Sequence, residues 1–390
     1  MTANLQPPAL LPTYTPFPFP LLRGERDRVF DPLGRSYWDF YGGHCVASTG
    51  HAHPLVAEAI AVQARELIFS STAAELPVRS RAAKALLDFA ESGRDAGMAS
   101  IFFCNSGAEA NENALKMACR LTGRHTFAAF QGGWHGRSTL ALSVTDDPAI
   151  TNPYAPLLAP CLRLPWNDVE ALEAADFSGV AGVIMEPIQS MSGIRPATAP
   201  FMIKVREKTK AAGALLIYDE VQTGMGRLGH PFAAGLHGVR PDMITSAKGL
   251  ASGVPMGALL LSAEAAASVK PGDLGSTFGG GPLACAALLA TLTVIGQEGL
   301  LQNVFVREQE IRESLSGTCV TEIRGSGLLL GLVVPGRAKQ LKAHLQDRHI
   351  LVGGSGDPDA LRLMPPLNVT RAAVDALAEA VRTFPAGDSK

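Results

Sequence analysis

Short runs of apolar residues alternate with longer amphipathic stretches through the middle of this 390-residue chain. Such alternation is typical of βα units, whose successive strands form a largely parallel sheet. The strands predicted from the apolar runs are Ser100–Cys104, Thr126–Phe130, Gly182–Met185, Leu215–Tyr218, Met243–Ser246 and Ala258–Leu261. Helices are predicted at Glu109–Thr122 and Pro200–Ala212.

A second α/β unit is predicted from about residue 300 onward. The pattern breaks near Pro282, and the strongly apolar helix that follows runs to about Gly296, where it is placed to connect two domains. The elements predicted after it are helices at 301–315, 336–346 and 370–383 and strands near 320–323, 328–334 and 361–363.

The N-terminal segment has a different character. Its first twenty-odd residues are rich in proline and carry no charged side chain, which predicts an extended arm lying on the body or on a neighbouring subunit. A β-hairpin is predicted from Arg28–Phe30 and Ser36–Phe40, and a helix from Pro54 to Glu66. We expect the arm and hairpin (1–45) to belong with a small C-terminal domain (286–390), and a large domain to span 46–285.

Charge and composition exclude several classes of protein. The formal net charge is −2, which argues against a nucleic acid or another polyanion as the main partner. Only 18% of the residues are charged, below the usual ~25%, which predicts an extensive subunit interface. The six cysteines form no CxxC pair, so neither a disulfide framework nor a metal site is expected. With no secretory signal and no apolar run long enough to span a membrane, the expected location is the cytoplasm.

One candidate site lies where a predicted strand ends and a helix begins, at Asn105-Ser106-Gly107-Ala108. Small residues there let backbone N–H groups and the helix dipole face an anion, most naturally a phosphate. The run matches neither a P-loop nor a GxGxxG fingerprint. An ordinary helix cap would look the same, so this run alone leaves both interpretations open.

Asp219 and Lys248 also follow predicted strands, at the edge where open parallel sheets bind ligands. A buried aspartate must be paired, either with a protonated ring nitrogen of a cofactor or with the backbone of the next turn. A lysine at the end of an apolar strand is unusual, and desolvation would make its amine the nucleophile that Schiff-base chemistry requires. A solvated surface lysine is the plain alternative. Together, a phosphate cradle, a ring-nitrogen acid and a Schiff-base lysine are what a protein supplies to pyridoxal phosphate.

Stretches that match one enzyme family run through nearly the whole chain, in the family's order and spacing. They are Tyr14–Pro18, Gly50–Pro54, Phe102–Glu112, Trp134–Arg137, Glu186–Gln189, Asp219–Gly224, Ser246–Leu250, Gly275–Gly279 and Leu361–Leu367. On these motifs the sequence resembles the class III, fold type I, pyridoxal-phosphate-dependent aminotransferases, and within them the acetylornithine and ornithine aminotransferase group. The resemblance implies an α/β fold with helices on both faces of a mostly parallel central sheet and a smaller C-terminal α/β domain.

The resemblance also implies roles for the residues that would surround the cofactor ring. Lys248 forms the Schiff base with the cofactor and moves the substrate proton. Asp219 pairs with the ring nitrogen, and Gln222 bonds the 3′-oxygen of the ring. Trp134 stacks on the ring, where the family usually has Phe or Tyr, and an indole offers a larger face.

Other matching residues are assigned to the phosphate and the substrates. The residues implied to cradle the phosphate are Ser106, Gly107 and Ala108. Thr277 would reach the phosphate from the neighbouring subunit, which implies a homodimer with shared active sites. Arg137 and Arg362 match two carboxylate-binding arginines. Tyr14 and Ser276 match substrate-contacting positions, although Tyr14 is equally suited to anchor the arm.

The chain departs from the family after Gln189, where ω-amine-specific members read Gly-Glu and this chain reads Ser190-Met191. The missing glutamate would mask Arg362 while an ω-amino group reacts, so Arg362 is expected to stay available to carboxylates. A second departure, Gly281 in place of the usual Asn, has no clear effect.

The resemblance predicts ping-pong transamination from an acetylornithine- or ornithine-like donor to an α-keto acid such as 2-oxoglutarate. Alternatives on the same scaffold are an α-amino acid, β-alanine or alanine–glyoxylate aminotransferase, a decarboxylating aminotransferase and an amino-acid racemase. A non-catalytic, ligand-sensing relative is disfavoured because Lys248 and Asp219 are both present.

Overall fold

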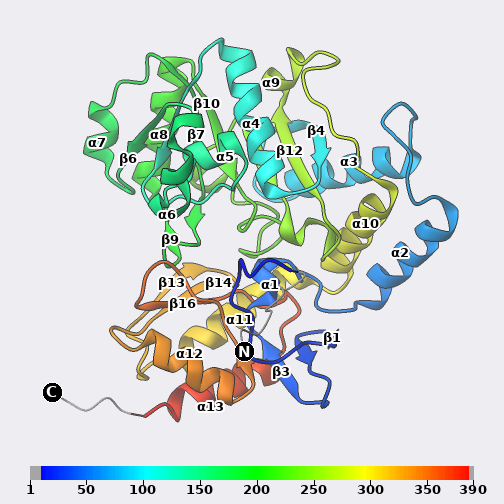
Figure 1. The fold of residues 1–390 in the computed structure, drawn as a ribbon, viewed down its shortest axis with the longest axis vertical. Coiled ribbons are helices and arrows are strands. Elements are labelled where there is room, and N and C mark those ends of the chain that lie inside the picture. The colour runs from blue at the N-terminus through cyan, green and yellow to red at the C-terminus, as the bar shows by residue number, and fades with distance from the viewer. Residues whose placement is uncertain (1–9, 386–390) are drawn as a thin grey trace, which may run out of the picture.

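The computed structural model describes residues 10–385, and its chain forms two lobes (Figure 1). The upper lobe is built on a seven-stranded sheet in which β12 runs antiparallel to both neighbours and every other pair is parallel. Across the sheet, the strands are β4 (Met98–Cys104), β12 (Gly257–Ser262), β11 (Met243–Ser246), β10 (Leu215–Asp219), β7 (Val180–Met185), β5 (Thr126–Phe130) and β6 (Cys161–Leu164).

Alternate residues of these strands pack into two separate cores. On one face, Phe127 of β5 packs in the core that contains Leu115 of α4 (Gly107–Thr122). On the other face, Phe130 packs in the core that contains Phe201 of α8 (Ala199–Ala212). Helices therefore cover both faces, which explains why the strands read as unbroken apolar runs and confirms the predicted α/β fold.

The lower lobe joins the two ends of the chain. Its antiparallel sheet contains β13 (Glu322–Ser326), β14 (Leu329–Val333) and β16 (Ala360–Leu363), and its helices are α11 (Leu300–Ser314), α12 (Ala338–Asp347) and α13 (Arg371–Arg382). A second sheet pairs the N-terminal strands β1 (Arg23–Glu25), β2 (Arg28–Phe30) and β3 (Ser36–Asp39) with β15 (Ile350–Leu351). Because β3 and β15 are parallel neighbours, the N-terminal hairpin packs with the C-terminal part of the chain.

The apolar helix after Pro282 is α10 (Pro282–Gln297), which packs against α2 (Pro54–Glu66) and α3 (Pro77–Glu91). Within residues 10–385, no single helix is long and apolar enough to cross a membrane. Only α10 and α11 taken together meet those criteria, and they are bent by 62°. Ten of the 16 residues of α10 are buried, so its apolar character reflects packing inside the protein.

The sequence patterns locate most elements within two residues but miss several. Helix α4 begins at Gly107, two residues before the predicted start, because the Ser106 side chain caps it. The missed helix α3 buries one apolar residue in every four, and the missed strand β6 is a four-residue edge strand. The shorter elements are α1 (Gly42–Cys45), α5 (Thr139–Val144), α6 (Pro148–Thr151), α7 (Val169–Ala174), β8 (Ile188–Gln189), β9 (Arg195–Pro196) and α9 (Ala263–Ala267), with 3₁₀ turns at Asn152–Leu157, Leu236–Gly238 and Lys248–Ala251.

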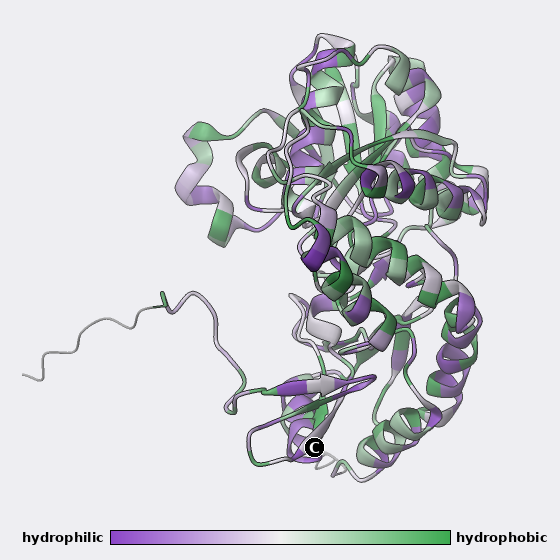
Figure 2. Cartoon of the chain, turned by 90° about the vertical axis from the view of Figure 1, so that its right-hand side faces the viewer, coloured by the Kyte–Doolittle hydropathy of each residue, from purple (hydrophilic) through white to green (hydrophobic). Residues whose placement is uncertain are grey.

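From residue 10 onward the proline-rich segment is extended, as predicted, and leaves the body of the protein (Figure 2), while the first nine residues of the predicted arm lie outside the described residues. Its contact with the lower lobe is aromatic: Phe19 stacks on Tyr37 with ring centroids 4.4 Å apart, and Phe17 stacks on Phe19 at 5.7 Å. Leu10 and Leu11 are more than three-quarters exposed, at 86% and 80%. The single chain therefore leaves Leu10 and Leu11 of this arm uncovered.

Candidate active site

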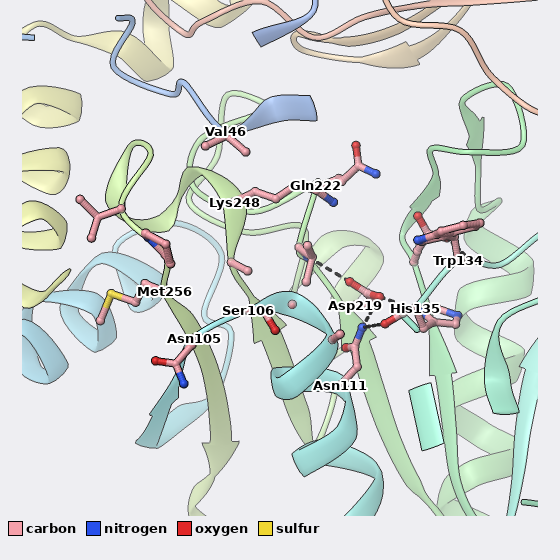
Figure 3. Close-up of a pocket in the computed structure, with 18 of the residues that line it drawn as sticks. Val46, Asn105, Ser106, Asn111, Trp134, His135, Asp219, Gln222, Lys248 and Met256 are labelled. Carbon is pink, nitrogen blue, oxygen red and sulfur yellow. Dashed lines mark hydrogen bonds and ion pairs between the residues drawn. The ribbon is translucent and has the colours of Figure 1, made fainter. Parts of the chain in front are cut away.

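A cavity of about 360 Å³ opens at the carboxyl ends of β4, β5, β7, β10 and β11 (Figure 3). Loops that follow these strands supply most of its lining, because the carboxyl ends of parallel strands meet at one edge of the sheet. The sequence-predicted residues that line it are Ser106, Gly107, Ala108, Trp134, Asp219, Gln222 and Lys248.

Asp219 is the last residue of β10, and its carboxylate is held by contacts from three directions (Figure 3). Its Oδ2 accepts a hydrogen bond from Asn111 Nδ2 at 2.8 Å and lies 2.8 Å from His135 Nδ1, while its Oδ1 accepts from Val221 N at 3.1 Å. A carboxylate can only accept, so Nδ1 of His135 carries a proton in this contact. The carboxylate is 4% exposed, so these contacts fix both its position and its direction.

Glu186, directly after β7, adds a second buried carboxyl group to the cavity. Its two oxygens accept hydrogen bonds from the backbone N–H groups of Trp134 (3.0 Å) and Ser190 (3.2 Å). Burial raises the pKa of Glu186 to about 7, with His135 opposing the shift and Asp219 adding to it. Near neutral pH this group therefore gains and loses a proton readily.

Lys248 follows β11 and extends over the cavity toward Gln222 (Figure 3). Its backbone is left-handed, with φ of 47°, which is costly for a residue with a side chain and turns the chain sharply after the strand. Burial lowers the pKa of the Lys248 ammonium, and nearby acidic groups offset this effect only in part. The lysine therefore releases its proton more easily than a surface lysine, as a nucleophilic amine requires.

The N-terminus of α4 faces the same cavity. Ser106 Oγ accepts from Glu109 N at 3.1 Å, and the N–H groups of Gly107 and Ala108 lie in the first turn, where a helix offers them no acceptor. A Cβ placed on Gly107 would lie 2.9 Å from Val221 Cγ1, so only glycine fits there. Free N–H groups and the positive end of the helix dipole make this turn suitable for an anion.

A second hydrogen-bonded chain leaves the cavity toward the lower lobe. Ser190 Oγ donates to Gln222 Oε1 at 3.0 Å and accepts from Arg362 Nη1 at 3.0 Å. Arg362 Nε donates to the carbonyl of Gly354 at 2.6 Å. Arg362 is 2% exposed, and no acidic side chain within residues 10–385 forms an ion pair with it. Met191, in contrast, lines a separate cavity.

Five predicted residues do not line the main cavity in this single chain. Arg137 lies over the Trp134 ring, with Cζ 5.4 Å from the centroid, and lines an adjacent apolar cavity. Tyr14 and Arg362 line another cavity, under the arm. Ser276 Oγ accepts from the cavity residue Asn105 at 3.1 Å, whereas the neighbouring Thr277 is exposed.

Sequence reasoning missed four residues of the site: Asn111, His135, Glu186 and Ser190. Asn111 lies one helical turn after Gly107, and this spacing could have indicated that it faces the same cavity. His135 lies within the matching stretch Trp134–Arg137, and its contact with Asp219 is that of a positioning residue. Only the folded chain reveals Ser190, because its partner Arg362 is 172 residues away.

Comparisons with known proteins agree with this geometry. Residues 11–384 match the family model described as aminotransferase class-III. The chain is 44% identical to the acetylornithine aminotransferase of Streptomyces coelicolor, over 92% of this chain and 88% of that protein. It is similar in structure to the N-acetylornithine aminotransferase of Stenotrophomonas maltophilia (TM-score 0.80, 32% identity, 95% of this chain and 96% of that one). It is also similar to the ornithine aminotransferase of Toxoplasma gondii, in which pyridoxal phosphate partly occupies the active site (TM-score 0.88, 30% identity, 96% and 91%).

The raised pKa of Glu186 predicts a pH dependence of stability. Between its ordinary pKa of 4.5 and about 7, the unfolded carboxyl group is ionised while the folded one keeps its proton. The free energy of unfolding should therefore fall as pH rises through this window, by up to about 1.4 kcal/mol per pH unit, and level off above it. Glu186→Gln should remove this slope.

The test is urea unfolding of both proteins from pH 4.5 to 8 at one protein concentration. Glu220, also buried, has its pKa raised to about 7 by burial and contributes a similar slope to both proteins. The difference between the two curves therefore isolates Glu186. Parallel curves across the window would mean that Glu186 is already ionised in the folded protein.

Proposed function

This chain belongs to the class-III aminotransferases, and we propose that it moves the amino group of an acetylornithine-like donor to an α-keto acid such as 2-oxoglutarate. It is a pyridoxal-phosphate-dependent transferase. The observation that carries the proposal is the convergence of Lys248, Asp219 and the first turn of α4 on one cavity. The choice of donor is supported by the acetylornithine aminotransferases, which are 38% to 44% identical to this chain.

The residues of the cavity fit pyridoxal phosphate. The first turn of α4 offers unpartnered N–H groups to the phosphate, and the absence of a Cβ at Gly107 lets this turn pack closely against Val221. Asp219 offers a fixed, buried carboxylate to a protonated ring nitrogen, and Gln222 an amide to the ring oxygen. The bound cofactor supplies an aldehyde that carries the amino group and a ring that accepts electrons.

Lys248 is proposed to hold the cofactor and to move the proton at the substrate carbon that bears the amino group. Both tasks need an amine that is neutral for part of the cycle, and burial lowers the pKa of Lys248 in the required direction. The left-handed backbone fixes where the side chain enters the cavity. Trp134, on the loop after β5, is proposed to cover the ring face.

Asp219 is proposed to face the protonated ring nitrogen, and its neighbours fix the position of its carboxylate. Hydrogen bonds from Asn111 and His135 set the direction of Oδ2. Glu186, whose pKa is raised to about 7 by burial, reduces the repulsion at Asp219 by carrying a proton part of the time. Asn111 and His135 thus act as positioning residues for Asp219.

Arg362 and Arg137 are proposed to bind the substrate carboxylates, since planar guanidinium groups pair well with them. Ser190 and Gly354 give Arg362 neutral partners only, which leaves its positive charge for a substrate. This observation also favours a second candidate donor, an α-amino acid, whose carboxylate lies next to the reacting amino group. Tyr14 and Ser276 are proposed to contact substrate from the arm and from the loop before α10.

We propose that two copies of the chain form a homodimer with shared sites, in the cytoplasm. Thr277 is exposed and does not line the cavity of its own chain, so the phosphate it would contact belongs to the other copy. Next to it, Phe278 is 63% exposed and lies 5.2 Å from the ring of Phe69, which is 41% exposed. Exposed aromatic side chains around a polar contact are typical of a subunit interface.

The donor is tested by measuring kcat/KM with acetylornithine, ornithine, 4-aminobutyrate, alanine and β-alanine, each against 2-oxoglutarate. We expect acetylornithine to give the highest value, and Lys248→Ala to abolish turnover while it still binds the cofactor. Higher kcat/KM with alanine would select the α-amino acid alternative. Turnover that survives in Lys248→Ala would overturn the chemistry itself.

Ser190→Ala should weaken the binding of keto acids. Loss of a hydrogen bond to a charged group costs about 1.5 kcal/mol or more, so KM for 2-oxoglutarate should rise roughly tenfold with little change in kcat. Ser192→Ala is the matched control, because its hydroxyl group bonds the carbonyl of Gly132 instead of Arg362. Equal KM values for the two variants would show that Ser190 does not position Arg362.

Shared sites predict complementation between two defective chains. In a hybrid dimer, one chain carries Lys248→Ala and the other carries Thr277→Ala. Each site takes Lys248 from one chain and Thr277 from the other, so both substitutions fall on the same site. A hybrid dimer of the two variants keeps one intact site, so we expect about half of the wild-type activity. Hybrids purified through two different affinity tags test this. Activity no higher than the mean of the two parent dimers would contradict sharing through Thr277.

A further inference from the structure

A short turn between β8 and β9 reaches from the upper lobe to the lower one (Figure 1). The two strands pair antiparallel, and β9 contacts β13 of the lower lobe. We call residues 190–194 the anchor turn. It begins with Ser190, which bonds Arg362, and ends with Ile194, whose side chain is fully buried.

The backbone of Ile194 is left-handed, with φ of 58°. A β-branched residue rarely adopts this conformation, because its side chain crowds the backbone there. Glycine would adopt it without strain, as the preceding Gly193 does with φ of 88°. A strained backbone persists only where the surrounding structure holds it, so the packing of the isoleucine side chain must offset the strain.

The side chain of Ile194 fills a space that two glycines of the lower lobe leave open. A Cβ on Gly325 of β13 would lie 2.6 Å from Ile194 Cγ2, and a Cβ on Gly331 of β14 would lie 2.9 Å from Ile194 Cβ. Leu329 and Met364, also of the lower lobe, belong to the same buried apolar cluster. An upper-lobe residue therefore packs inside the lower lobe.

This packing lies directly beside Arg362. Gly331 is opposite Arg362 in the pairing of β14 with β16. On the other side of the anchor turn, the carbonyl oxygen of Met191 accepts from Gly356 N at 2.7 Å. Gly356 follows closely after Gly354, whose carbonyl oxygen accepts from Arg362 Nε. The anchor turn thus contacts both the strand next to Arg362 and the segment that holds its guanidinium group.

We propose that Ile194 is a positioning residue, which holds the lower lobe against the anchor turn so that Ser190 meets Arg362. Ser190 Oγ accepts from Arg362 Nη1 at 3.0 Å and donates to Gln222 at the cofactor cavity. By filling the space beside the glycines of β13 and β14, the isoleucine fixes where Arg362 lies relative to that cavity. The inference rests on the proposed function only in that Arg362 binds a substrate carboxylate.

Amide hydrogen exchange of the holoenzyme tests the anchor without turnover. In Ile194→Ala, the amide of Gly356 should exchange roughly tenfold faster than in the wild type, because the contact that holds it opens more often. Ile194→Val keeps a β-branched side chain and should retain the wild-type rate. Ile311→Ala is the matched control, because it removes the same atoms from an equally buried position in α11, outside this cluster.

Kinetics test the positioning of Arg362. Ile194→Ala should raise KM for 2-oxoglutarate by up to about tenfold with little change in kcat, as expected for Ser190→Ala. The double variant should raise KM no further than Ser190→Ala does, because both substitutions act on the same arginine. Ile194→Val and Ile311→Ala should keep the wild-type KM. A double variant whose KM rises by the product of the two single effects would show that Ile194 does not act through Ser190.

A wild-type exchange rate at Gly356 in Ile194→Ala would overturn the proposal, as would equal acceleration in Ile311→Ala. A KM that rises in Ser190→Ala but not in Ile194→Ala would also overturn it. If neither variant changes KM, the carboxylate role of Arg362 in the proposed function is refuted instead, and the exchange rates alone decide whether Ile194 anchors the lobes.

Discussion

The position of the buried Asp219 carboxylate depends on Asn111, and most of the site is arranged by the same side chain. Asn111 Nδ2 donates both to Asp219 and to the carbonyl oxygen of His135, at 2.8 and 2.7 Å. Its Oδ1 accepts from Thr245 Oγ1, at 2.6 Å, on the strand that leads to Lys248. One amide therefore ties α4, the loop after β5 and strands β10 and β11 together. Because a buried amide must satisfy these bonds, the anion-binding turn, the ring acid and the lysine stay in fixed relation to one another.

The residues proposed to bind the substrate depend on a different constraint, which is the contact between the two lobes. Ser190 belongs to the upper lobe and Arg362 to the lower one. Because Ser190 bonds both Arg362 and Gln222, it helps to fix the position of the arginine relative to Gln222. Tyr14, on the arm, lines the same cavity as this arginine. The proposed substrate residues Ser190, Arg362 and Tyr14 therefore lie where the lobes and the arm meet, whereas most of the proposed cofactor residues of the same chain lie at the edge of the sheet.

The sequence predicts the sheet edge well because strands buried on both faces read as continuous apolar runs. Gly107, Asp219 and Lys248 each follow such a run, so the pattern alone is enough to expect that they meet at one edge. The contact of Ser190 with Arg362 cannot be expected in this way. The two residues are 172 positions apart in the sequence, a separation that no periodicity records. Strand β6 is missed because it is a four-residue edge strand with Arg163 at its centre, which gives no continuous apolar run.

The structure changes the interpretation of the sequence most at Arg362, where the family's glutamate is missing. The pattern Ser190-Met191 draws attention to the absent glutamate at position 191. In the folded chain, the residue that meets the arginine is Ser190, and the charge of Arg362 is left for a substrate. Two neutral partners hold the guanidinium group in place without masking it, so the same arginine can serve a carboxylate in both halves of the reaction.

The central claim is that the residues around Asp219 and Lys248 support transfer of an amino group in two separable halves. The direct measurement mixes the purified holoenzyme with the amino donor alone and counts keto product per active site. The account predicts one equivalent of keto product and the cofactor recovered in its amine form, with 2-oxoglutarate restoring the aldehyde form. A donor that changes configuration while the cofactor remains an aldehyde would instead indicate a racemase and contradict the account.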